Sequence, residues 1–100
     1  MQFITHRLTE LGQRLKSQLA DLRIVEEQLA LVEEDAADAH LRALVSETPL
    51  ADVEASELQG QVDALSRERD HLLHSIGVIR SDQDALLDKL AAQTPNSEEQ

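Results

Sequence analysis

The one strong interruption in the helical pattern of this chain lies within residues 43–51, which read ALVSETPLA. Thr48 followed by Pro49 is typical of a helix start, because threonine caps free backbone N–H groups and proline fits the first helical position. Asp52 follows in the first turn, where the helix dipole favours a negative charge. The stretch therefore predicts the end of one helix, a loop at residues 46–48 and a second helix that begins at Pro49.

Apolar residues on both sides of this loop recur at alternating steps of four and three, which is the heptad spacing of a coiled-coil seam. We predict the first helix over about residues 3–45 and the second over about residues 49–92, with residues 93–100 as a disordered polar tail. The seam positions are Ile4, Leu8, Leu11, Leu15, Gln18, Leu22, Val25, Leu29, Val32, Ala36, Ala39 and Ala43, then Ala51, Ala55, Leu58, Val62, Leu65, Arg69, Leu72, Ile76, Ile79, Gln83, Leu86 and Leu90.

A loop this short forces the two helices to lie antiparallel, so the two seams must face each other. Folding the sequence about Glu47 pairs every seam position with one on the other helix, and the two residue numbers sum to 94. Leu8, for example, meets Leu86. The predicted fold class is therefore all-α, a long antiparallel two-helix coiled-coil hairpin that forms a single domain over residues 1–92.

Three seam positions are polar, namely Gln18, Arg69 and Gln83. Polar seam residues weaken a coiled coil but fix its register and partner number. The long side chain of Arg69 is expected to reach outward, toward Glu26 or Gln28, so that its charge stays solvated. We interpret all three as residues that specify the pairing.

The composition disfavours several classes of function. Nine Lys and Arg against twenty Asp and Glu leave a net charge of −11, which repels nucleic-acid phosphates and anionic membranes. There is no cysteine, no apolar run long enough to span a membrane and no signal-peptide pattern at the first residues. We expect no direct nucleic-acid binding, no membrane association and a cytoplasmic location.

Large apolar residues facing away from the seam gather beside the loop, within a segment, residues 35–66, that carries a net charge of −6. Exposed apolar groups of this kind indicate a contact site, and the alternative is that they pack on one another as a cap. We predict that this acidic, apolar tip binds a protein partner. The candidate residues are Leu41, Leu44, Val45, Glu47, Leu50, Asp52, Val53 and Glu54.

With Glu47 and Asp52 at its end, the predicted hairpin resembles in architecture the bacterial transcription factors of the Gre and DksA type. Those proteins insert an acidic coiled-coil tip into the secondary channel of RNA polymerase, so the resemblance implies a transcription regulator. They also carry a globular or zinc-bearing domain, and the loop here, residues 46–52, departs from their tip motifs. A self-assembling structural protein is a further alternative.

Catalysis is not expected, because a two-helix rod offers no concave pocket in which carboxylates could acquire the pKa values that acid–base chemistry needs. His71 and His74 share a helix face with Asp70, but two histidines on an open helix make a poor metal site. We therefore expect no metal and no cofactor.

A second group of apolar residues, Ile24, Leu31 and Val78, lies outside the seam. Side-by-side pairing of two hairpins into a four-helix bundle would cover them, so a homodimer is expected. The alternative is that they are isolated surface residues, which are normal on any protein.

Overall fold

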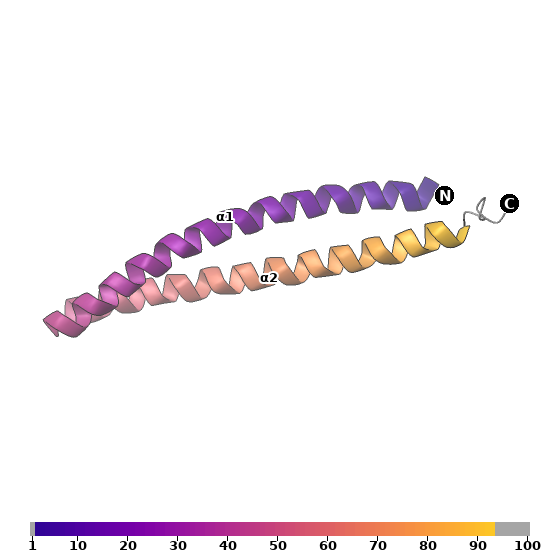
Figure 1. Ribbon diagram of the computed structural model, residues 1–100. Coiled ribbons are helices and arrows are strands. Elements are labelled where there is room, and N and C mark those ends of the chain that lie inside the picture. The colour runs from indigo at the N-terminus through magenta and orange to yellow at the C-terminus, as the bar shows by residue number, and fades with distance from the viewer. Residues whose placement is uncertain (1, 94–100) are drawn as a thin grey trace.

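The computed structural model describes residues 2–93 as two antiparallel helices, α1 (Gln2–Ser46) and α2 (Pro49–Gln93), joined by a two-residue loop (Figure 1). Each helix has 45 residues and is therefore about 68 Å long at 1.5 Å per residue. This confirms the predicted all-α helical hairpin. The observed helix ends lie within one residue of the predicted ones, Gln93 is helical, and the rest of the predicted tail lies outside the described residues.

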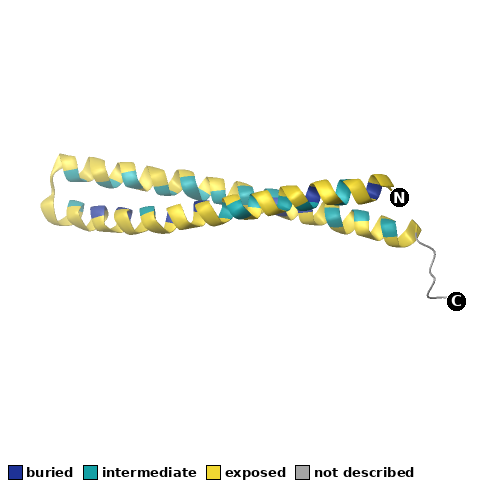
Figure 2. Cartoon of the chain, turned by 90° about the horizontal axis from the view of Figure 1, so that it is seen from above, coloured by how far each residue is buried: buried dark blue, intermediate teal, exposed yellow. Residues whose placement is uncertain are grey.

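The predicted seam is the interface between the helices. All twenty-four seam positions are buried or half-buried, whereas most other described residues are exposed. Leu11 and Ile79 are the largest fully buried side chains. Figure 2 shows the buried and half-buried residues as a stripe along the facing sides of both helices. The core is thus one narrow line of aliphatic side chains, because heptad spacing keeps only one stripe of each helix against its partner.

The neighbours across the seam follow the predicted register. Ala36 lines the same groove as Ala55 and Gln59, which flank its predicted partner Leu58. The two ribbons cross at different points in the two views at right angles, so the helices wind around each other (Figures 1 and 2). This winding is expected for a seven-residue repeat on a helix of 3.6 residues per turn.

The loop is held by backbone and side-chain hydrogen bonds at both helix ends. The Ala51 N–H donates to Thr48 Oγ1 at 3.3 Å and the Asp52 N–H to the Thr48 carbonyl at 3.2 Å, so Thr48 caps α2 as the sequence predicts. At the end of α1, the Glu47 N–H donates to the Ala43 carbonyl at 3.1 Å. Glu47 closes that last turn with a positive φ of 50°.

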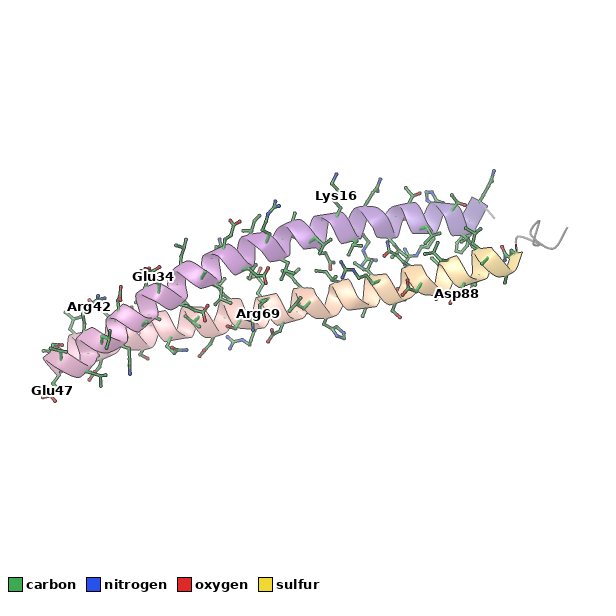
Figure 3. All side chains as sticks on the ribbon, in the orientation of Figure 1. Lys16, Glu34, Arg42, Glu47, Arg69 and Asp88 are labelled. Carbon is green, nitrogen blue, oxygen red and sulfur yellow. The ribbon has the colours of Figure 1, made fainter. Side chains whose placement is uncertain are left out.

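The polar seam residues behave differently from one another. The carbonyl oxygen of the Gln18 side chain, Oε1, is buried and has no hydrogen-bond partner. The Arg69 side chain does turn outward (Figure 3), but its Nε and Nη2 donate to Asp70 Oδ1 at 3.1 and 3.0 Å. The charge of Arg69 is therefore not buried, as expected, but its hydrogen-bond partner is the adjacent Asp70 on α2 and not Glu26 or Gln28 on α1.

Ion pairs add little to the pairing of the helices. Residues 2–93 form three pairs within 4 Å, and each lies within one helix: His6 with Glu10, Arg7 with Glu10, and Arg69 with Asp70. Such exposed pairs contribute only about 0–1 kcal/mol each. Apolar packing in the seam therefore holds the hairpin together.

Candidate functional site

The tip carries an open groove of about 440 Å³ to which both helices contribute. Its apolar lining comes from Leu41 and Val45 of α1 and Leu50 of α2, with Glu54 and Arg42 adding opposite charges. Leu41 and Val45 are four residues apart and so share one helix face, and the short loop brings Leu50 beside them. The remaining lining residues are Ser46, Thr48 and Ala51.

The apolar residues of the tip remain open to solvent. Val45 is 85% exposed and Leu50 is 68% exposed, while Leu41, Leu44 and Val53 are between 51% and 62% exposed. Residues packed as a mutual cap would lose most of this surface. The cap alternative therefore does not describe the hairpin, and the tip presents a concentration of exposed apolar surface.

The loop holds Glu47 in a backbone conformation that is rare for its residue type. A φ of 50° lies in the left-handed region, which costs a non-glycine residue about 1–2 kcal/mol. The adjacent Ser46 hydroxyl donates to the Arg42 carbonyl at 2.8 Å and lies 3.5 Å from Thr48 Oγ1. Figure 3 shows the Glu47 side chain projecting from the very end of the rod. The loop thus presents a carboxylate at the point of the rod furthest from its open end, which is the end where Gln2 and Gln93 lie.

The structure brings together half of the residues predicted for the tip. Leu41, Val45, Leu50 and Glu54 line the groove. Sequence reasoning missed four of the lining residues, namely Arg42, Ser46, Thr48 and Ala51. The predicted register gave a partial indication of this lining, because it pairs Ala51 with Ala43, the residue next to Arg42.

The other four predicted tip residues lie outside the groove lining and are all exposed: Leu44, Glu47, Asp52 and Val53.

Carboxylates outnumber cations around the groove. Glu57 lies seven residues from Leu50, and Asp38 lies seven residues from Val45, so both share the side of the seam on which the groove opens. Arg42 is the only Lys or Arg in the segment 35–66. The site therefore combines an apolar floor with a negatively charged surround, which favours an apolar ligand with positive charge around it.

The three residues predicted for self-association are exposed. Leu31 is 66% exposed, Ile24 is 50% exposed and Val78 is 46% exposed. Ile24 lines a small groove with Asp21, Gln28 and Glu68, on the same side of the seam as the tip groove. Their exposure leaves a second apolar surface along the stem.

Within residues 2–93, no three His, Asp or Glu side chains are grouped so that they could hold a metal ion. Neither described helix contains an apolar window of the kind that crosses a membrane.

Comparison of the chain with protein-family models, curated proteins and solved structures finds no match, so the assignment of a function depends on the geometry of the tip.

Proposed function

We propose that the protein is a non-enzymatic interaction module, an adaptor, scaffold or regulatory subunit, whose tip binds a protein partner. The observation that supports this most directly is the exposed apolar groove at the tip, formed by Leu41, Val45 and Leu50. Apolar surface of this kind is costly to leave in water, at about 25 cal/mol per Å². A groove placed at the end of a stiff rod is accessible to a partner without any change in the stem.

The negative charge around the groove indicates which kind of partner would fit it. An apolar ridge flanked by Lys or Arg would place its apolar side chains in the groove and its cations near Asp38, Glu54 and Glu57. An amphipathic helix with leucines on one face and lysines at its edges has this chemistry. Complementary charge would mainly speed association and exclude acidic competitors, and its effect would weaken with salt.

The test uses a fluorescent amphipathic Leu/Lys helical peptide as the probe, with binding followed by anisotropy. Replacing Leu41 and Leu50 with Ser should weaken binding by at least about tenfold, because each removes an apolar contact worth roughly 1 kcal/mol or more. Leu87→Ser is the matched control, since Leu87 is 51% exposed but lies at the far end of the rod. Circular dichroism verifies that all variants remain helical.

Equal affinity in the groove variant and the Leu87→Ser control would refute the tip as the binding site. Capture of native partners from a cell extract with the same pair of variants then identifies what the tip binds. Recovery of RNA polymerase, lost on Glu47→Ala with Asp52→Ala, would support the transcription-regulator alternative instead. Large oligomers without any bound protein would support the structural alternative.

A further inference from the structure

Exposed apolar residues continue from the tip groove toward the middle of the rod on one side of the seam. Val45, Leu31 and Ile24 are separated by seven or fourteen residues, so all three flank the seam on the side where Val45 lines the tip groove. Ile24 lines a second groove with Glu68 of α2, so both helices border this side. In the same stretch of α1, Leu44 is the one exposed large apolar residue on the opposite side. We call the side that runs from the loop to Ile24 the groove strip.

Carboxylates accompany these apolar residues on both helices. At the heptad positions that flank the seam along the groove strip, six carboxylates and one cation, Arg42, leave a net charge of −5. The opposite side of the seam also carries carboxylates, so the apolar residues distinguish the strip and the charge indicates its ligand. A ligand with both leucines and Lys or Arg is favoured here. The six carboxylates are Asp21, Asp35, Asp38, Glu54, Glu57 and Glu68.

The charge changes sign on the same side of the seam beyond the groove strip. Toward the open end, three cations and two carboxylates leave a net charge of +1. A basic ligand is therefore attracted to the half of the rod next to the loop and gains nothing by extending past the middle. The residues are Arg7, Arg14 and Lys89 against Glu10 and Asp82.

The groove strip is not flat, because it follows a seam that winds around the rod axis (Figures 1 and 2). A flat surface of another protein would contact the strip over only part of its length. A helix with a seven-residue repeat supercoils in the same sense as α1 and α2 and would follow the winding. The shape of the strip therefore fits a third helix, as in a three-stranded coiled coil.

Successive seven-residue steps along the groove strip define the sequence that a third helix has to match. Starting at the loop, the steps are Val45 with Leu50, Asp38 with Glu57, Leu31 with Ala64, and Ile24 with His71. The register brings the two members of each step level to within one residue. The second step is thus a pair of exposed carboxylates, and the other three present exposed aliphatic side chains. A complementary helix would carry Leu, Lys, Leu and Leu at seven-residue spacing, because each side chain then meets its like or its opposite charge.

We propose that the partner bound at the tip is a basic amphipathic helix of about 22 residues that winds along the groove strip as the third strand of a coiled coil. Its leucines contact Val45, Leu31 and Ile24, and a Lys or Arg lies between Asp38 and Glu57. At 1.5 Å per residue this helix is about 33 Å long, half the length of the rod. The inference deepens the proposed function and rests on it, because the tip groove is the first of the four steps.

Two fluorescent peptides test the extent of the site by anisotropy. The long probe has about four heptads, with Leu, Lys, Leu and Leu at the seven-residue steps and further Lys at its flanks, and the short probe has about two heptads and reaches only the tip. The long probe is made in both sequence orders, which places its central Lys beside Asp38 and Glu57 for either direction of binding. The better long probe should bind at least about tenfold tighter than the short one.

Leu31→Ser separates the stem from the tip. It should weaken the long probe by about tenfold and leave the short probe unchanged, because Leu31 is 66% exposed and lies beyond the reach of the short probe. Leu73→Ser is the matched control, since Leu73 is 48% exposed but flanks the seam on the opposite side, and it should change neither affinity. Circular dichroism verifies that both variants remain helical.

The carboxylate pair has its own test. Asp38→Asn with Glu57→Gln should weaken the long probe by about tenfold, and should have a much smaller effect on a version of the probe in which the central Lys is replaced by Leu. An equal loss for the two probes would show only general attraction to an acidic rod and would overturn the placement of the Lys.

The outcomes distinguish this inference from the proposed function. A long probe that is weakened by Leu41→Ser with Leu50→Ser, but not by Leu31→Ser, would overturn the third helix along the stem and leave the tip as the binding site. A long probe that none of these substitutions weakens would refute both. A dimer of the free chain in light scattering that Leu31→Ser dissociates would show that a second copy covers the strip, and would overturn the basic helix as its occupant.

Discussion

Replacing Gln18 with Leu should stabilise the hairpin. The Oε1 atom of Gln18 is buried in the seam without a hydrogen-bond partner, and a buried unsatisfied polar group costs about 1–3 kcal/mol. Leucine has a similar size, and the adjacent seam residues Leu15 and Leu22 show that the interface accepts it. The expected gain in the free energy of unfolding is therefore about 2 kcal/mol.

The measurement is urea denaturation followed by circular dichroism at one protein concentration, which keeps any self-association constant. With a slope of about 2 kcal/mol per molar urea, the midpoint should rise by about 1 M. Gln83→Leu is the matched control: Gln83 also occupies the seam and is half-buried, but has no buried unpaired atom. Its substitution should give only the smaller gain from added apolar area.

An equal rise in the two variants would show that apolar area, not the unpaired oxygen, accounts for the gain. A fall in the midpoint of Gln18→Leu would refute the reasoning altogether. The same substitution should also loosen the register, because a polar seam residue favours one alignment of the helices over its neighbours.

Three further predictions concern the loop, the glycines and the charge. Glu47→Gly should raise the free energy of unfolding by about 0.5–1 kcal/mol, since glycine adopts positive φ without strain, and a lower thermal midpoint would contradict this. Gly12→Ala, Gly60→Ala and Gly77→Ala should each add about 0.5–1 kcal/mol in urea titrations, because a Cβ at these positions has no neighbour within 4 Å. Loss of stability in any of them would reveal a contact beyond the single hairpin. Raising the salt concentration should increase the urea midpoint, since the net charge is −11 and no described ion pair joins the two helices, and a decrease would show that attractive pairs dominate.

The seam and the turn were predictable because they depend on local rules that a sequence displays directly. Heptad spacing identifies the buried stripe whatever the partner helix, and the burial of Ile4, Leu11 and Ile79 follows from it. Thr48 before Pro49 identifies the helix start through backbone chemistry alone, and the bond from the Ala51 N–H to Thr48 Oγ1 agrees with that reading.

The sequence did not predict which of several possible partners a side chain would bond, nor the backbone angle at the loop. The sequence offered Arg69 both Asp70 on its own helix and Glu26 on the other as partners, and its bond to Asp70 depends on the side-chain rotamer, which the spacing of residues does not encode. Glu47 gave no signal of its positive φ, because glycine or asparagine usually marks such a position. The groove lining by Arg42 and Ala51 depends on how closely the helices approach, which sequence alone leaves open.

The contacts that contribute most to stability lie away from the loop, whereas the proposed binding surface lies at the loop end of the rod. Toward the end of the rod away from the loop the seam is rich in leucine and isoleucine, whereas near the loop Ala39 faces Ala55 and Ala43 faces Ala51, and these alanines remove far less apolar surface from water. The tip is therefore the region where the helices separate most easily, and hydrogen exchange should be fastest there and slowest near Leu11 and Ile79. A partner that covers the exposed tip would supply the apolar contact that the alanine seam lacks. Binding should therefore slow exchange at the tip far more than in the stem.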